Sequence, residues 1–281
     1  MITCLSIHAP RFTLYALTLL LPCTLVGGLP QPMCVYYGQA LDGYGLPYRT
    51  NAQVLLYHGA NVIASQTIAG SLTPGVNFAL YVHLDDGRSP VPYSSRALRS
   101  GDIVSIMVRD PEGLKTIMEN QAVPTVGQPG DLVMINATAA EDLNRDGLPD
   151  PWEQELINWS GGALRTLADV HPGDDFDGDG MTNLQEYRAG TFAFLDYDYL
   201  FIEQYDRTPN NRLRLTFLSV PGKVYSVGYA ANITDSAWQA SPLALSDTDP
   251  FKQTPVEGTG DWLSLYVPID ASNWFFRLDV R

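Results

Sequence analysis

The sequence predicts a mainly β protein in which two antiparallel β-sandwich domains are joined by a small segment of loops and short helices. Short apolar runs recur along most of the chain, and turn-forming pairs such as Asp42-Gly43 and Pro74-Gly75 separate them. The chain contains 24 glycines and 20 prolines, a content that favours many turns over long helices. Its 281 residues are enough for two domains with separate cores.

The first sandwich is expected over residues 29–135. Its candidate strands are Cys34–Ala40, Ala52–His58, Val62–Ile68, Phe78–Leu84, Ile103–Arg109 and Thr116–Glu119. A Pro/Gly-containing connection is expected between residues 120 and 140, and it holds one short apolar run at Leu132–Ile135. The stretch Tyr36–Tyr48, together with Ala52–Leu56, resembles the opening of transthyretin-like sandwich modules in secreted bacterial proteins. That resemblance implies a structural or binding module and no catalytic chemistry.

Two acidic stretches, at residues 142–153 and 175–186, repeat one spacing of oxygen-bearing side chains. Each places such side chains at positions 1, 3, 5, 9 and 12, with Gly at position 6, and the two starts lie 33 residues apart. This is the spacing of an EF-hand loop, in which position 7 adds its main-chain carbonyl and a Glu at position 12 supplies two oxygens to Ca²⁺. The sequence therefore predicts two Ca²⁺ sites, with the ligand residues Asp142, Asn144, Asp146, Leu148, Asp150, Glu153, Asp175, Asp177, Asp179, Met181, Asn183 and Glu186.

The charge of this region supports cations over a merely solvated acidic loop. Residues 141–187 hold 12 acidic and two basic side chains, a net charge of −10 in 47 residues. Such a segment repels itself and favours disorder unless counter-ions are present. Yet apolar residues suited to packing are interleaved with the acids, among them Trp152, Leu156 and Tyr187. We therefore expect a calcium-binding linker over residues 136–192.

A short helix is expected after the first loop. Asp150 is placed to cap a helix that starts at Pro151 and ends at about Asn158, because proline suits the first helical turn. A third short helix, at about Ala163–Asp169, would connect this helix to the second loop. One turn of helix is possible at Ala137–Glu141, before the first loop.

The second loop leads into an expected helix at Asn183–Ala189. Asn183 and Glu186 form a capping-box-like pair, and Gly190 is a suitable stop. The order of loop then helix resembles dockerin repeats and thrombospondin type 3 segments, in which the ions hold a small module rigid between larger domains. Pro149 departs from paired EF-hands, because position 8 needs an N–H to bridge to the partner loop. We therefore expect the two loops to bind independently.

The second sandwich is expected over residues 193–281. Its candidate strands are Leu200–Gln204, Leu213–Leu218, Lys223–Tyr229, Trp238–Ser241, Trp262–Val267 and Trp274–Val280. The stretch Ser219–Tyr229, Trp238 and the closing Phe275–Asp279 resemble a C-terminal sandwich module that often follows calcium-binding tracts in exported bacterial proteins. The resemblance carries no specific activity with it.

The N-terminus has the pattern of a secretory signal over residues 1–28. Arg11 precedes an apolar run at Phe12–Val26, and Gly27 and Gly28 are small residues near a cleavage point. The run of about 15 residues is short for a membrane span, although a retained anchor is the alternative. We expect a secreted or cell-surface protein with no membrane span after the signal is removed.

Charge and motifs exclude several classes of function. A net charge of −14 and the lack of any basic cluster make nucleic acid and anionic membrane surfaces unsuitable partners. The histidines do not form a zinc motif, and no nucleophile elbow occurs, so no catalytic residues are assigned. Sugar rings stack on exposed aromatic side chains, and the first sandwich is rich in tyrosines: Tyr36, Tyr37, Tyr44, Tyr48, Tyr81 and Tyr93.

These observations favour a non-enzymatic, exported structural or adhesive surface protein, in which Ca²⁺ makes the linker between two β-sandwiches rigid. Its partner would be a glycan or another surface protein. A carbohydrate-binding accessory module is the first alternative, and a calcium-dependent hydrolase is the second.

Overall fold

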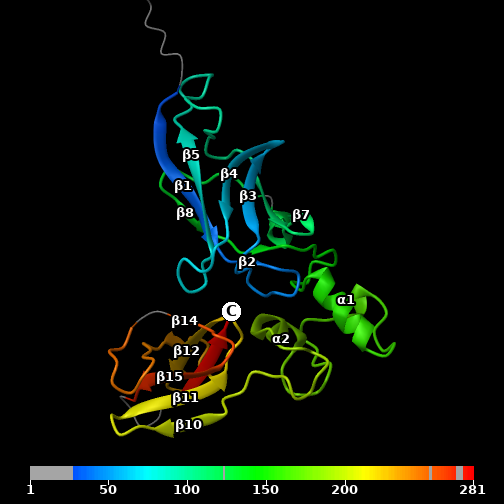
Figure 1. Ribbon diagram of the computed structural model, residues 1–281, viewed down its shortest axis with the longest axis vertical. Coiled ribbons are helices and arrows are strands. Elements are labelled where there is room, and N and C mark those ends of the chain that lie inside the picture. Colours follow the sequence, from blue (N-terminus) through cyan, green and yellow to red (C-terminus); the bar gives the residue numbers. More distant parts are fainter. Residues whose placement is uncertain (1–27, 123, 253–254, 270–274) are drawn as a thin grey trace, which may run out of the picture.

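The computed structural model describes residues 28–122, 124–252, 255–269 and 275–281, and it is mainly β (Figure 1). Apart from Gly28, the expected export signal lies outside these residues, as does Trp274 in the last expected strand. No helix among the described residues is long and apolar enough to cross a membrane. The predicted fold class is confirmed at the level of a mainly β protein with several sheets.

The N-terminal half forms two larger sheets and one small one. The first sheet has the order β5–β1–β8 and the second β4–β3–β6–β7, while β2 and β9 form a pair. Their bounds are β1 (Pro30–Gly38), β2 (Ala40–Leu41), β3 (Gln53–His58), β4 (Asn61–Thr67), β5 (Phe78–Asp85), β6 (Ser105–Asp110), β7 (Gly113–Thr116), β8 (Leu132–Met134) and β9 (Ala137–Thr138).

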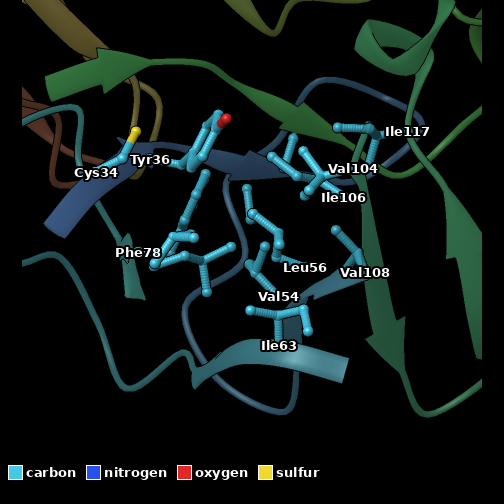
Figure 2. Packing of buried hydrophobic residues seen from close by; sticks show 14 of the residues in the cluster. Cys34, Tyr36, Val54, Leu56, Ile63, Phe78, Val104, Ile106, Val108 and Ile117 are labelled. Atoms are coloured by element: carbon cyan, nitrogen blue, oxygen red, sulfur yellow. The ribbon is translucent and has the colours of Figure 1, made fainter. Parts of the chain in front are cut away.

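Alternation along the strands builds the core between these sheets. In β5 the side chains of Phe78, Leu80 and Val82 are buried, whereas those of Tyr81 and His83 are exposed. They join a cluster that includes side chains from β1, β3, β4 and β6, and Figure 2 shows how these converge. The period-two alternation of β5 therefore separates its buried face from its exposed face.

Three expectations for this half are wrong in detail. Two pairings are parallel, β1 with β8 and β2 with β9, so the arrangement is not purely antiparallel. The expected strand Thr116–Glu119 is instead the end of β7 followed by a 3-10 helix at Met118–Ala122. Ala137–Glu141 contains strand β9 in place of a helical turn, because Ala137 and Thr138 pair with β2, just beyond the predicted domain boundary at residue 135.

The C-terminal half contains two antiparallel sheets around a second core. One has the order β10–β11–β15, and the other centres on β12, which pairs with β13, β14 and β16. Their bounds are β10 (Gln204–Arg207), β11 (Arg212–Leu218), β12 (Val224–Ala230), β13 (Gln239–Ala240), β14 (Val256–Glu257), β15 (Trp262–Pro268) and β16 (Phe275–Val280). Phe217 and Tyr225 pack within this core with ring centroids 4.8 Å apart. The expected strand at Leu200–Gln204 is wrong, since β10 begins only at Gln204.

The segment between the two halves holds helices α1 (Asp150–Trp159) and α2 (Asn183–Ala189), beside the junction of the two groups of sheets (Figure 1). The predicted bounds of α2 are confirmed. The expected third helix is reduced to a short 3-10 turn at Leu167–Asp169. A third apolar cluster joins the two helices, and within it Trp152 meets Tyr187 edge to face at 6.1 Å.

Candidate metal centre

The two acidic loops share the backbone arrangement that an EF-hand spacing predicts. The first aspartate of each accepts hydrogen bonds from main-chain N–H groups within its own loop: Asp142 from Asp146 and Gly147, and Asp175 from Gly178 and Gly180. The position-6 glycines, Gly147 and Gly180, have φ values of 95° and 100°. Only glycine adopts such values without strain, which accounts for its place in the motif.

Three aspartates of the second loop converge on one point. Asp175, Asp177 and Asp179 each direct a carboxylate oxygen to within 4.8 Å of the others. Carboxylates placed so closely repel one another unless a cation lies between them. The Asp179 Oδ1 atom accepts a hydrogen bond from Met181 N at 2.7 Å, which holds the position-5 and position-7 residues together.

Buried oxygens without a hydrogen-bond partner gather in this same loop. They are Asp177 Oδ2, Asp179 Oδ2, Asn183 Oδ1 and both carboxylate oxygens of Glu186. Buried polar atoms are nearly always paired, and an unpaired buried carboxylate is costly. All five atoms belong to side chains that the motif assigns as ligands, and oxygen is the ligand that Ca²⁺ prefers. The residues therefore fit a calcium ion.

Asn183 shows how the fold orients one of these oxygens. Its Nδ2 donates to the carbonyl of His171 at 2.8 Å, which fixes the amide and leaves Oδ1 as the unpaired acceptor. Its main-chain N–H donates to Asp174 O at 2.7 Å, so the start of α2 is tied to the start of the loop. A position-9 oxygen is thereby in place before any ion enters.

Burial and like charges act together on the position-12 glutamates. Burial is the main cause that raises the pKa of Glu186 to about 8, and Asp177 and Asp179 add repulsion. Burial likewise raises the pKa of Glu153 to about 7, with Asp146 as the next cause. A divalent cation would reverse this effect, because it stabilises the ionised carboxylate.

The side chain at position 3 separates the first loop from the second, because Asn144 stands where the second loop has Asp177. The Asn144 amide nitrogen donates to Asp146 Oδ2 at 3.1 Å and to Glu153 Oε1 at 2.9 Å, so two expected ligands are engaged by a donor. Glu153 Oε2 is the unpaired buried oxygen that remains there. For Asn144 to act as a ligand, its amide must turn over and present Oδ1.

The residue at position 4 also differs between the two loops. Arg145 has a φ of 61° where the second loop has Gly178 at 83°. A left-handed conformation costs a residue with a Cβ atom about 1–2 kcal/mol, so the first loop carries strain that the second avoids. The structure therefore brings together the expected ligands of the second loop more fully than those of the first.

Both predicted N-terminal helix caps are wrong, whereas the predicted stop of α2 at Gly190 is confirmed. Asp150 does not cap α1: the N-cap is Pro149, without a side-chain bond, and Asp150 Oδ1 instead accepts from Leu143 N at 2.8 Å. At α2 the reciprocal pair is Thr182 and Gln185, one residue before the expected Asn183 and Glu186. The capping-box spacing fits both pairs. Asn183 and Glu186 also occupy metal-ligand positions 9 and 12, and this spacing could have excluded them as the capping pair.

Position 8 does not bridge the two loops in this structure. Pro149 has no N–H, and the equivalent N–H of Thr182 donates to Gln185 Oε1 at 2.8 Å. The loops are connected instead through the apolar cluster around Trp152 and Tyr187. Sequence reasoning also missed Asp198, which contributes to the raised pKa of Glu186 from outside the loop.

Helix α2 contacts both groups of sheets. Lys223, just before β12, donates from Nζ to the Tyr187 carbonyl at 3.2 Å and lies 5.7 Å from the centre of the Tyr187 ring. Gly45, in the turn after β2, packs so closely that a Cβ there would lie 2.5 Å from Tyr187 Cε2. Gln39 Nε2 also donates to Gly222 O at 2.9 Å, directly between the two groups of sheets.

The tyrosines considered for sugar stacking have mixed environments. Tyr36 is buried and donates its hydroxyl to Thr125 O, while Tyr48 donates to Asp110 Oδ2. Tyr44 and Tyr81 are the exposed members of the set. The six tyrosines therefore do not form one exposed platform.

Comparison of the chain with models of protein families, with curated proteins and with solved structures found no match.

Proposed function

We propose that this protein is an exported calcium-binding structural protein in which Ca²⁺ makes the segment between two β-sheet regions rigid. The observation that carries the proposal is the set of five buried, unpaired oxygens in the second loop, all on predicted ligand residues. A bound Ca²⁺ would pair these atoms and neutralise the aspartates that repel one another.

The contacts of α2 support a mechanical role for the ion. Glu186, the position-12 ligand, lies in α2 beside Tyr187, and Tyr187 contacts both Trp152 of α1 and Lys223 of the C-terminal half. An ion that holds Glu186 would therefore hold the helix to which both halves are attached. Cell-surface adhesion, through a glycan or another surface protein, is the role we propose for the assembled protein.

The affinity need not be high for this purpose. Extracellular calcium modules bind with dissociation constants of about 10⁻⁴–10⁻³ M. At about 2 mM calcium this range stabilises the folded state by about 0.6–1.8 kcal/mol for each site. That corresponds to a rise in unfolding temperature of about 1–7 °C for each site in a protein of this size.

The test is thermal unfolding with about 2 mM calcium and with excess chelator. We expect calcium to raise the unfolding temperature, and Glu186→Gln to lose most of the rise from the second loop. In chelator the variant should be as stable as the unmodified protein or slightly more so, because Gln is neutral without binding the proton that buried Glu186 needs.

The exposed Glu203 provides a matched control. Glu203→Gln removes one negative charge outside the loops and should keep the full response to calcium. Equal losses of stability for Glu186→Gln in calcium and in chelator would contradict the proposal.

A further inference from the structure

A cavity of about 310 Å³ lies beside the first acidic loop, where α1, the chain after α2 and the turn after β2 meet. Its wall is largely aromatic, with Tyr44, Trp152, Phe192 and Phe194. Glu155 is the one charged residue among the described residues that line it. A cavity of about 150 Å³ is large enough for benzene, so this one has room for a ring with a short substituent.

Helix α1 holds the carboxylate of Glu155 in the wall. Trp152, Glu155, Leu156 and Trp159 share one face of the helix, at the spacing that brings side chains together. Glu155 Oε1 accepts a hydrogen bond from Trp159 Nε1 at 2.9 Å. The Trp159 ring in turn stacks on Phe194, with centroids 4.9 Å apart and planes at 12°. The carboxylate of Glu155 is thus held by the Trp159 ring, which is exposed on one side and stacked on Phe194 on the other.

Thr191 adds a second polar group to the lining. Its Oγ1 is buried and has no hydrogen-bond partner, unlike most buried polar atoms. A hydroxyl oxygen accepts hydrogen bonds from an ammonium group, as a carboxylate does.

We propose that this cavity binds an organic cation: an ammonium group carried on an aromatic or other apolar body. The apolar wall suits the body of such a ligand, and the aromatic rings together with Glu155 attract its positive charge. The net charge of −14 attracts cations to the protein in general. A sugar fits less well, because its many hydroxyls need more polar partners than Glu155, Thr191 and the Tyr44 hydroxyl provide. This site goes beyond the proposed calcium function and is tested separately from it.

Three probes that carry a phenyl ring on a two-carbon chain and differ in charge test the proposal by calorimetric titration of the full chain. Phenethylamine is the cation, 2-phenylethanol the neutral analogue and 3-phenylpropionate the anion. We expect phenethylamine to bind most tightly and 3-phenylpropionate least. Equal affinity for all three, or no binding of phenethylamine, would overturn the proposal.

Variants of the wall then locate the site. Glu155→Gln keeps the shape and the acceptor for Trp159 but removes the charge, so phenethylamine affinity should fall about tenfold while 2-phenylethanol affinity is unchanged. Phe192→Ala should lower the affinity for both phenethylamine and 2-phenylethanol. Thr191→Val should weaken phenethylamine without lowering the unfolding temperature, because Oγ1 has no protein partner to lose.

Tyr205 is an exposed aromatic residue outside the cavity, and Tyr205→Ala should change nothing. Phenethylamine binding that is insensitive to Glu155→Gln and Phe192→Ala would place it elsewhere and overturn the proposal.

The same samples separate this proposal from the calcium function. An unfolding temperature that rises with calcium, in a protein that does not bind phenethylamine, removes the cavity proposal alone. Binding of phenethylamine in a protein whose unfolding is unaffected by calcium removes the calcium proposal alone.

Discussion

The ammonium group of Lys223 donates a hydrogen bond to the main-chain carbonyl of Tyr187, with Nζ and O 3.2 Å apart. The two residues belong to different parts of the chain: Lys223 precedes strand β12, and Tyr187 lies in helix α2 directly after the glutamate at position 12 of the second loop. Burial lowers the pKa of Lys223 to about 8, although Asp42 opposes this effect. One lysine therefore joins the candidate calcium loop to the C-terminal sheets.

Replacement of Lys223 should weaken the coupling between the candidate calcium loop and the C-terminal sheets without lowering the stability of the protein. Lys223→Met keeps the apolar stem and removes a buried charge, so the free energy of unfolding should change by less than about 1 kcal/mol or increase. Calcium binding should then no longer change the stability of the C-terminal half. Hydrogen exchange of residues 183–189 and 220–230, with calcium and with chelator, measures this. In the unmodified protein, calcium should slow exchange in both segments. In the variant, calcium should slow exchange in residues 183–189 alone. Protection of both segments in the variant would contradict the coupling role.

The first loop should respond to a change at Asn144. Asn144→Asp removes the amide donor that engages Asp146 and Glu153 and supplies a further carboxylate. Calorimetric titration should show tighter calcium binding at one site, while the calcium-free protein becomes less stable because like charges are brought together. The unmodified protein should bind its first ion in the second loop, where the oxygens are already unpaired. Glu153→Gln changes the first loop, so it should abolish the weaker of the two calcium sites. If it abolishes the tighter site instead, the first loop is the one that binds the first ion.

Calcium affinity should depend on pH through Glu186. Its pKa rises from 4.5 to about 8 in the calcium-free folded state. Between these values the folded state holds a proton that the unfolded state has lost. The stability of the calcium-free protein therefore falls as pH rises through this window. Calcium binds the ionised carboxylate, so apparent affinity should rise from about pH 6 to pH 8, and binding at pH 7 should release protons.

Titrations at pH 7 in two buffers with different ionisation enthalpies measure that proton release. Glu186→Gln is the control, since it cannot release a proton from this position. Affinity that stays constant between pH 6 and pH 8 would show that Glu186 does not contact the ion.

Close packing at Gly45 should make this turn sensitive to a single methyl group. A Cβ at Gly45 would lie 2.5 Å from the Tyr187 ring, and the φ of 78° already disfavours other residues. Gly59 is a matched control, with a φ of 57° and open space around its Cα. Gly59→Ala should cost about 1–2 kcal/mol of unfolding free energy from backbone strain alone. Gly45→Ala should cost about 1–3 kcal/mol more, because Tyr187 must move. Denaturant unfolding compares the two, and equal costs would mean that this contact adds nothing.

Local spacing was enough to predict several parts of the candidate site. Glycines at position 6 with left-handed backbones, the convergence of Asp175, Asp177 and Asp179, and the bounds of α2 all follow from interactions among residues close in sequence. The caps were mistaken because two overlapping residue pairs satisfy the same rule at α2, and because Asp150 is taken by the main chain of Leu143. The spacing of residues in the sequence cannot choose between two hydrogen-bond partners that both satisfy the same capping rule.

The sequence by itself determined the mainly β class, the alternation of apolar and polar residues in strands such as β5, and the two acidic loops with their EF-hand-like spacing. These properties depend on the periods of strands and loops, which the order of residues encodes directly. Only the tertiary structure decided the parallel pairings of β8 and β9, the contact of Tyr187 with Gly45 and Lys223, and the aromatic cavity beside Glu155. These features join residues far apart in the chain, and they depend on how the sheets and helices pack.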